Sequence, residues 1–337
     1  MHKSLVGKMS LVCFALLAQG SVAAEVKDCG LKRYASIDLA GAADGYLLVP
    51  VTIQGTRAYM VLNMATPFSS VTQSAVDSLS LQVKPMATQF GKSADKTPDQ
   101  HMATATPFEF GGIQFRSATF VMLPPFHFQE TSADAPVVGI LAMDVLRGFD
   151  IELDAAHRKL NLFSQDHCPG HAVYWSAKYD SAPLRFGPLG EFYFPMELGG
   201  KKLETTLSTS KPMTTLNTDA TRKLFNFDSH SADVETETDN DGRTTAHYRA
   251  MKLSGEGLEI INARISLIDL PADNPCHLSS HLGAATYEGC LGIHPLALGQ
   301  NVISKLHFYI ATKEKMLYFT PAEASGKGDV AAPVAAH

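Results

Sequence analysis

The chain has 337 residues, of which 45% are hydrophobic and 18% are charged, and its formal net charge is −6. This composition suits one large or two medium globular domains with apolar cores, and it excludes a chain that is disordered throughout. The sequence carries no basic cluster that could follow a phosphate backbone, so we expect no nucleic-acid partner.

The first 24 residues have the pattern of a secretory signal peptide. Lys3 and Lys8 precede the apolar stretch MSLVCFALLA, and the small residues SVAA follow it. The pattern predicts cleavage near Ala23 or Ala24, and losing the two lysines takes the formal charge from −6 to −8. No later apolar run approaches the roughly 20 residues that a membrane helix needs. We therefore expect a periplasmic or secreted protein without a membrane span.

Four cysteines remain once Cys13 leaves with the signal. An even number of cysteines in an oxidising compartment predicts two disulfides, for which three pairings are possible. Cys29 opens the first globular segment and Cys168 closes it, while Cys276 and Cys290 lie within one region of the second. We therefore favour Cys29 with Cys168 and Cys276 with Cys290.

The chain repeats itself at a spacing of 145 residues. The segment LLVPVTIQGTRAYMVLNMATPFSSVTQ, from Leu47, aligns without a gap to FYFPMELGGKKLETTLSTSKPMTTLNT, from Phe192. Alternating apolar residues on either side of Gly55, and of the glycines at 199–200, predict a hairpin in each copy. Its second strand runs into a loop, and a strand rich in Ser and Thr leaves that loop.

Later segments repeat in the same order. FEFGGIQFRSATFVML resembles MKLSGEGLEIINARISLI, GILAMDVL resembles GCLGIHPL, and FDIELDAAHRKLNLF resembles LHFYIATKEKMLYFT. These matches indicate a tandem duplication of a mostly β unit. After the signal peptide at 1–24, we expect a first lobe at 25–168, a linker at 169–187, a second lobe at 188–322 and a disordered tail at 323–337.

The order of parts in each copy resembles the bacterial retropepsin-like and pepsin-like aspartic proteases. In that family a lobe begins with a hairpin, enters a loop reading Asp-Thr-Gly-Ala, and reaches a short glycine-flanked apolar segment before a final hairpin. The resemblance covers nearly the whole mature chain, twice. It implies a mostly β fold of two pseudo-symmetric acid-protease barrel lobes that face a central cleft.

The family's catalytic positions fall on Asn63 and Ser208, so both lack the carboxylate. An amide cannot take a proton from water near neutral pH, and Ser208 has no base beside it in the sequence. Of the family's loop threonines only Thr209 survives, because Met64 replaces the other. We expect no catalytic residue, and we expect the loops to line the cleft. They comprise Asn63, Met64, Ala65 and Thr66, and Ser208, Thr209, Ser210 and Lys211.

Other carboxylates are more simply explained as structural. Asp144, Asp150 and Asp154 are predicted to lie at a strand-to-helix junction and a hairpin turn, where Asp caps helices and closes turns. His294 takes the place that matches Asp144 in the second copy.

Two further motifs have simpler explanations than chemistry. Ser208 to Lys211 matches the Ser-x-x-Lys pattern of penicillin-recognising enzymes, but the segment aligns as strand, loop and strand and lacks the partner motifs. His167 and His171 lie on either side of Cys168, and His277 and His281 follow Cys276. Because those cysteines are expected in disulfides, we expect surface histidines, no metal site and no cofactor.

Two polar inserts occupy the place of the family's flap hairpins. They span residues 87–107 and 228–247, and the second carries an acidic run from Asp233 to Asp241. Such a run is usually a solvated loop, but over a cleft it would favour a cationic or polar ligand.

Three hypotheses follow. The leading one is a pseudoprotease that binds a peptide or protein segment in the cleft, through main-chain hydrogen bonds and side-chain pockets. The second is an active aspartic-type endopeptidase that uses a non-standard site or a dimer, and it depends on family analogy alone. The third is a structural module in which Met64, Pro67, Lys211 and Pro212 close the cleft floor.

Overall fold

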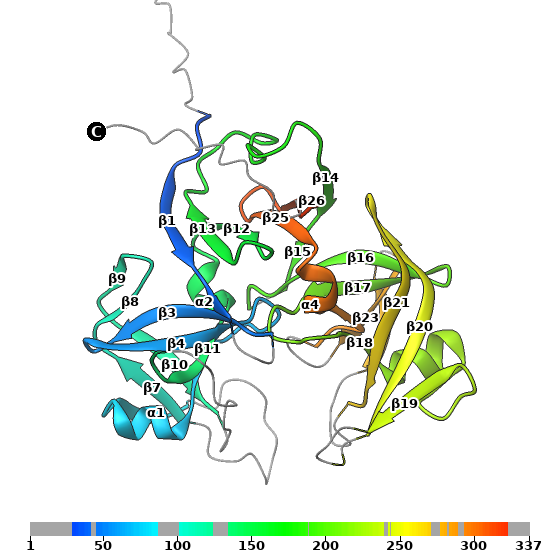
Figure 1. Ribbon diagram of the computed structural model, residues 1–337, viewed down its shortest axis with the longest axis horizontal. Helices are drawn as coiled ribbons and strands as arrows, with labels where there is room; N and C mark the ends of the chain where they lie inside the picture. The colour runs from blue at the N-terminus through cyan, green and yellow to red at the C-terminus, as the bar shows by residue number, and fades with distance from the viewer. Residues whose placement is uncertain are drawn as a thin grey trace, which may run out of the picture.

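The computed structural model describes residues 29–41, 45–86, 101–123, 134–187, 189–238, 242, 244–270, 277–281, 283–288 and 293–322. These residues form three β-sheets, with short helical segments between the strands. In Figure 1 a central sheet lies at the top, and one lobe lies below it on each side. The predicted signal peptide at 1–24 and the predicted tail at 323–337 lie outside the described residues.

The central sheet takes strands from both halves of the chain, in the order β1-β13-β12-β25-β26-β14. Its strands are β1 (Arg33–Asp38), β12 (Asp150–Asp154), β13 (Lys159–Phe163), β14 (Asp180–Pro183), β25 (Leu306–Ala311) and β26 (Met316–Pro321).

A pseudo-twofold axis passes through this sheet between β12 and β25. Ile151 pairs with Ile310, and Leu153 pairs with Phe308. The two hairpins correspond at a spacing of 157 residues, so Phe308 is the counterpart of Ile151, and Ile310 that of Leu153. Each strand thus contacts its own counterpart in a self-complementary register, as in an isologous dimer.

The first lobe is a sheet in the order β6-β7-β10-β5-β11-β4-β3-β8-β9, with β2 paired to β3. Its strands are β2 (Ala40–Gly41), β3 (Leu47–Ile53), β4 (Thr56–Leu62), β5 (Ser70–Val71), β6 (Gln82–Pro85), β7 (His101–Ala105), β8 (Phe108–Phe110), β9 (Ile113–Phe115), β10 (Ala118–Met122) and β11 (Val137–Leu141). Helix α1 (Gln73–Ser78) follows β5, and α2 (Met143–Leu146) follows β11.

The second lobe is a sheet in the order β15-β16-β20-β21-β18-β24-β17-β23-β22, in which β16 also pairs with β17 and β19 with β20. Its strands are β15 (Arg185–Phe186), β16 (Phe192–Leu198), β17 (Lys201–Leu207), β18 (Thr214–Asn217), β19 (Val234–Thr238), β20 (Thr244–Gly255), β21 (Leu258–Ile268), β22 (His277–His281), β23 (Ala284–Glu288) and β24 (Leu296–Leu298). Helix α3 (Thr218–Ala220) continues into the π-helical η1 (Thr221–Phe225), and α4 (Gln300–Ile303) follows β24.

Alternating apolar residues place these strands against the core. In β16, Phe192, Phe194, Met196 and Leu198 are buried, while the residues between them are partly or fully exposed. All four belong to a core cluster that continues through both lobes and the central sheet. Burying one such side chain contributes about 1.5–3 kcal/mol, so the period-two pattern fixes which face of each strand turns inward.

The duplication extends to the strand register. In the first lobe β11 runs parallel to β4, with Leu141 beside Leu62. In the second lobe β24 runs parallel to β17, with Leu298 beside Leu207. Leu298 lies 157 residues after Leu141, and Leu207 lies 145 residues after Leu62. This residue-by-residue repetition confirms the expected class, a mostly β fold of two pseudo-symmetric lobes.

One alignment made from the sequence is wrong. GILAMDVL corresponds to LALGQNVI, which starts at Leu296. The strand and helix β11 and α2 of the first copy match β24 and α4 of the second copy, 157 residues later. The glycines of GCLGIHPL make that segment look similar to GILAMDVL, but it starts seven residues before the true counterpart. The second copy carries its glycine at Gly299, where an added Cβ would lie 2.3 Å from the backbone of Met213. The counterpart of Asp144 is therefore Asn301 and not His294.

The segment at 169–187, expected to link the lobes, contributes strands to two sheets. β14 is the counterpart of β1, since Ile37 pairs with Leu160 on β13 and Ala182 pairs with Leu317 on β26. β15 then joins the edge of the second lobe beside β16. The repeated unit thus includes the strand that precedes each lobe.

The expected disulfide between Cys29 and Cys168 is present, with a Cα to Cα distance of 4.8 Å. It joins the segment before β1 to the segment after β13. Cys276 and Cys290 lie outside the described residues. In the part of the chain that the structure describes, no helix is long and apolar enough to cross a membrane.

Replacing Cys29 and Cys168 by serine is expected to lower the free energy of unfolding by about 2–4 kcal/mol, because the bridge closes a long loop in the unfolded chain. Urea denaturation of the mature chain measures this change. The single Cys29→Ser variant should lose as much as the double variant. Equal stability of wild type and both variants would contradict the assignment.

Candidate functional site

The first loop leaves β4 and is held by its neighbour β11. The N–H of Asn63 donates to the carbonyl oxygen of Leu141 at 2.9 Å. Asn63 Oδ1 accepts a hydrogen bond from the N–H of Ala65 at 3.0 Å, and the side chain is nearly buried. The amide oxygen of Asn63 therefore closes the loop, as short polar side chains do in turns.

The second loop leaves β17 and is attached in the same way. The N–H of Ser208 donates to the carbonyl oxygen of Leu298 at 2.8 Å, and the carbonyl oxygen of Ser208 accepts from the N–H of Lys211 at 3.3 Å. Ser208 is 1% exposed. The loops thus have equivalent attachments on either side of the pseudo-twofold axis.

Thr209 joins the two loops directly. Its hydroxyl donates to the carbonyl oxygen of Leu62 at 2.7 Å and accepts from the N–H of Met64 at 3.2 Å. Met64 occupies the position of the first loop that corresponds to Thr209, and its side chain is buried in the core. Because Met64 has no hydroxyl, the reciprocal contact is absent.

The short helices α2 and α4 support the loops from the side of the central sheet. Gln300 donates its backbone N–H to the carbonyl oxygen of Lys211 at 2.8 Å and its side-chain Nε2 to that of Thr209 at 2.6 Å. On the other side the N–H of Met143 donates to the carbonyl oxygen of Thr66 at 3.3 Å. Figure 1 shows α2 and α4 between the two lobes, below the central sheet.

Asp144 has a structural role that its counterpart shares. Its carboxylate accepts from the N–H of Ser69 at 3.0 Å and from the Ser69 hydroxyl at 2.6 Å. In the second lobe Asn301 Oδ1 accepts from the N–H and the hydroxyl of Thr214 at 2.8 and 2.9 Å. Because a neutral amide makes the same pair of bonds, the charge of Asp144 is not needed. Sequence reasoning missed Ser69 and Thr214, although the spacing of 145 places them as counterparts.

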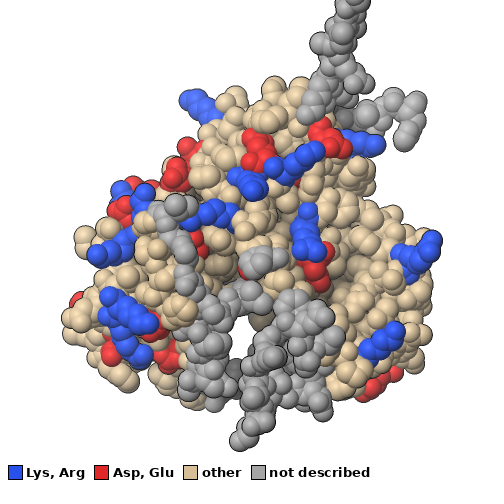
Figure 2. Space-filling view, turned by 180° about the vertical axis from the view of Figure 1, so that it is seen from behind, with Lys and Arg blue, Asp and Glu red and all other residues tan. Residues whose placement is uncertain are grey.

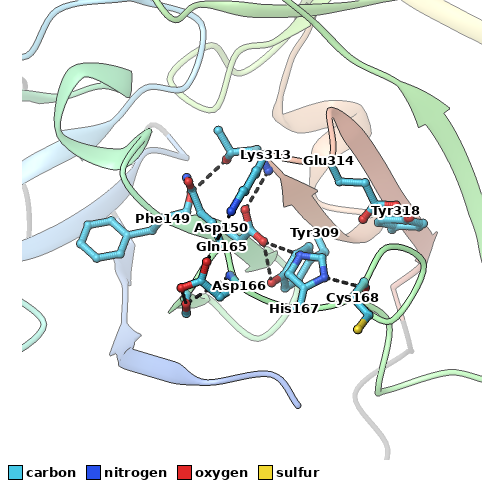
Figure 3. A network of polar contacts seen from close by, with 12 residues as sticks. Phe149, Asp150, Gln165, Asp166, His167, Cys168, Tyr309, Lys313, Glu314 and Tyr318 are labelled. Atoms are coloured by element: carbon cyan, nitrogen blue, oxygen red, sulfur yellow. Dashed lines mark hydrogen bonds and ion pairs between the residues drawn. The ribbon is translucent and has the colours of Figure 1, made fainter. Parts of the chain in front are cut away.

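Asp150 belongs to a buried network and not to a turn or junction, so that expectation is wrong. Its carboxylate lies 2.6 Å from His167 Nε2, and it accepts from the N–H of Thr312 at 2.8 Å and the hydroxyl of Tyr309 at 3.2 Å (Figure 3). Burial raises the pKa of Asp150, while the Thr312 N–H and His167 oppose this. Asp154 does lie at the hairpin turn, where it accepts from the backbone N–H of its neighbour three residues on.

The histidines divide into two kinds. His167 is buried, which corrects the expectation of a surface residue; its Nδ1 lies 2.9 Å from the carbonyl oxygen of Cys168, which can only accept. His171 and His277 are exposed as expected. Within the described residues no group of three or more His, Cys, Asp or Glu side chains is placed to hold a metal ion.

The two polar inserts contribute strands to hairpins at equivalent positions. β7 lies between β6 and β10, and β20 lies between β19 and β21. Residues 87–100 and most of 239–243 lie outside the described part. In β19 the acidic side chains meet basic partners, since Glu237 contacts Arg264 at 2.5 Å and Glu235 lies 3.9 Å from Arg249. These pairs leave little charge there for a cationic ligand.

Charges of both signs are interspersed elsewhere on the surface. On the face shown in Figure 2, lysines and arginines lie beside aspartates and glutamates, with no extended patch of one sign among the described residues.

Lys211 stays in a loop and does not begin a helix. Residues 209–210 form a turn and residues 212–213 a bend, and β18 follows them. This geometry lacks the helix start on which the Ser-x-x-Lys mechanism depends. Lys211 Nζ donates to Thr215 Oγ1 at 3.5 Å, and burial lowers the pKa of the amine.

Comparison with known proteins gives a distant likeness. No protein-family model and no curated protein matches the chain. Among solved structures it is similar to conglutin gamma, a unique basic 7S globulin from lupine seeds, with a TM-score of 0.44 and 12% identity over 86% of this chain and 95% of that one. The basic 7S globulin from soybean has a TM-score of 0.44 and 10% identity over 86% and 97% of the two chains. A retropepsin-like aspartic protease from Rickettsia conorii has a TM-score of 0.29 and 14% identity over 40% and 96%. The two-lobed fold follows from the strand registers of this chain and does not depend on these similarities.

The variant Thr209→Val is expected to lower the free energy of unfolding by about 1–3 kcal/mol, because it leaves a buried N–H and a buried carbonyl oxygen without their partner. Urea denaturation measures the loss.

Thr206→Val is the matched control. Among the residues that the structure describes, the buried Thr206 hydroxyl has no hydrogen-bond partner, and Val61 occupies the equivalent position of the first lobe. This control should be neutral or stabilising. Equal losses in the two variants would show that the Thr209 contact does not stabilise the protein.

Proposed function

We propose that this protein binds a peptide or protein segment between its two lobes and does not cleave it. The supporting observation is the pair of loops that Thr209 holds in contact, with Asn63 and Ser208 where catalysis would need two carboxylates. The contact between the loops supports an arrangement like that of the family the sequence resembles, and neither loop position offers a carboxylate to activate water.

Aspartic-protease chemistry needs two carboxylates that share one proton. Asn63 carries an amide whose oxygen is used to close its own loop. Ser208 is buried, and in the described part of the chain no hydrogen bond joins its hydroxyl to a histidine or a carboxylate. Neither residue can deprotonate water near neutral pH.

Binding requires less than catalysis. An extended segment can be held by main-chain hydrogen bonds to strand edges, while pockets for alternate side chains give preference. The hairpins β6–β7 and β19–β20 lie at equivalent positions of the two lobes and supply such edges. Losing the carboxylates leaves these contacts available.

The alternative of an active endopeptidase needs a carboxylate from elsewhere. Asp144 is on the helix that supports the first loop, but its oxygens are engaged by Ser69 and by the N–H of Val145. The alternative of a filled structural module rests on bulky loop residues, yet Met64 packs into the core. The first observation counts against an endopeptidase, and the second removes Met64 from the residues that could fill the cleft.

We further propose that the protein works in a periplasmic or secreted setting. The disulfide between Cys29 and Cys168 fits an oxidising compartment.

A cleavage and retention assay tests the proposal. The purified mature chain is incubated from acid to neutral pH with a complex peptide mixture, and mass spectrometry reads the free and the retained fractions. We expect no cuts at any pH and a reproducible set of retained peptides.

The Asn63→Ala, Ser208→Ala double variant controls for contaminating proteases. Cuts made by the wild type and lost in this variant would overturn the proposal in favour of an endopeptidase. A chain that neither cuts nor retains any peptide would favour the structural module.

A further inference from the structure

A hollow of about 180 Å³ lies on the outer face of the first lobe, where β3, β4 and β8 pair. Pro50 and Thr52 of β3 face it, because the residues on either side of each point into the core. In Figure 1 the turn of the β3–β4 hairpin points away from the second lobe. Arg57, which also lines the hollow, is six residues before Asn63 along the chain, or about 20 Å of extended strand. The hollow is therefore separate from the two loops.

Two opposite charges line this hollow without meeting. Thr52 pairs with Arg57 on β4 and with Glu109 on β8. Directly paired residues point to the same face of a sheet, so the three side chains form one row with the threonine in the middle. Adjacent strands are about 4.8 Å apart, which sets Arg57 and Glu109 about 10 Å apart at their Cα atoms.

The second lobe does not repeat this arrangement. The row 145 residues later reads Lys202, Glu197 and Ser254, with the same pairing. There the two charges are on adjacent strands, where directly opposite groups of opposite sign attract each other. The separated charges belong to the first lobe, and the second lobe supplies matched control positions.

Both walls of the hollow are fixed by the fold. On one side the Tyr59 hydroxyl donates to the carboxylate of Asp134 at 2.9 Å, and the Tyr59 N–H donates to the carbonyl oxygen of Pro136 at 2.8 Å. On the other side Gly111 lies against the central sheet, since an added Cβ would be 2.6 Å from Ile37 Cδ1. Small-ligand sites are usually formed in advance in this way.

The two charges have hydrogen-bonding capacity to spare. Arg57 contacts Asp134 through one nitrogen at 3.4 Å, longer than the about 2.7–2.9 Å of a strong charge-assisted bond. The carboxylate of Glu109 has no hydrogen bond or ion pair within the part of the chain that the structure describes. Charges in a concavity with apolar walls attract counter-charges more strongly than charges on a flat surface. The hollow thus offers donors at one end and acceptors at the other.

We propose that this hollow binds a small zwitterion, an α-amino acid with a short side chain. Glu109 accepts hydrogen bonds from the ammonium, the Thr52 hydroxyl is a second acceptor, and Arg57 donates to the carboxylate. The hollow has the volume of about six water molecules, so it suits a ligand of few non-hydrogen atoms. Pro50 and Ala58 supply apolar surface for the side chain. This site is additional to the proposed peptide binding and does not depend on it.

The test uses saturation-transfer NMR of the mature wild-type chain at neutral pH with an equimolar pool of glycine, alanine, serine and valine. A second pool holds the matched carboxylic acids, which lack the ammonium, and a third holds the matched amines, which lack the carboxylate. Both kinds of analogue are smaller than the amino acid, so a steric clash cannot explain weaker binding. We expect at least fivefold stronger signals from one or more amino acids than from the analogues.

Four variants locate the effect, with the strongest amino acid titrated by calorimetry. Glu109→Gln and Arg57→Gln should each weaken binding at least tenfold, because each removes one of the two charges. Glu197→Gln and Lys202→Gln remove the equivalent exposed charges of the second lobe and should leave the affinity unchanged within twofold. Urea denaturation establishes that each variant is folded.

Three results would overturn the inference. Amines that bind as tightly as amino acids would show a cation site without a role for Arg57, and acids that do so would show an anion site without a role for Glu109. No signal from any pool, or equal losses in all four variants, would show that the hollow is not a zwitterion site. None of these results bears on peptide binding, which the cleavage and retention assay tests separately.

Discussion

The buried hydroxyl of Thr209 is the contact on which the arrangement of the site depends. It donates to the carbonyl oxygen of Leu62 and accepts from the N–H of Met64, the residues on either side of Asn63. These two bonds fix the position of one loop relative to the other. Each loop is also held to its own lobe by a backbone hydrogen bond, to the carbonyl oxygen of Leu141 in the first lobe and of Leu298 in the second. The paired strands β12 and β25 join the two halves of the chain, and Thr209 joins the loop that carries Asn63 to the loop that carries Ser208.

The two halves have diverged unequally around this contact. In the first loop Met64 packs into the core at the position where the second loop carries the Thr209 hydroxyl. The second loop carries the Thr209 hydroxyl and the partly buried amine of Lys211. The supporting pairs below the loops have stayed equivalent, because Asp144 with Ser69 and Asn301 with Thr214 make the same bonds. The supporting hydrogen bonds are thus equivalent in the two lobes, while the loop residues above them differ.

The fold could be predicted from the sequence because its evidence is local and repeated. The match from Leu47 to Phe192 fixed the hairpins, the loops and the spacing of 145. The alignment failed near Leu296, because the glycines at 289 and 292 stand closer to the expected pattern than Gly299 does. Backbone approach decides where a glycine is needed, and only the folded chain shows that Gly299 lies against Met213.

The site was predictable in its residues and not in its contacts. Asn63 and Ser208 follow from the aligned loops, but the bonds of Thr209 depend on distances across the two lobes. The buried pair of Asp150 and His167 was misread for the same reason, since its partners come from three separate strands and loops.

The most direct measurement is hydrogen exchange of the mature chain with and without a retained peptide, with the mass of that peptide read in the same experiment. We expect slowed exchange at residues 63–66 and 208–211 while the mass of the peptide stays unchanged. Protection confined to other surfaces, or a peptide recovered as fragments, would contradict it.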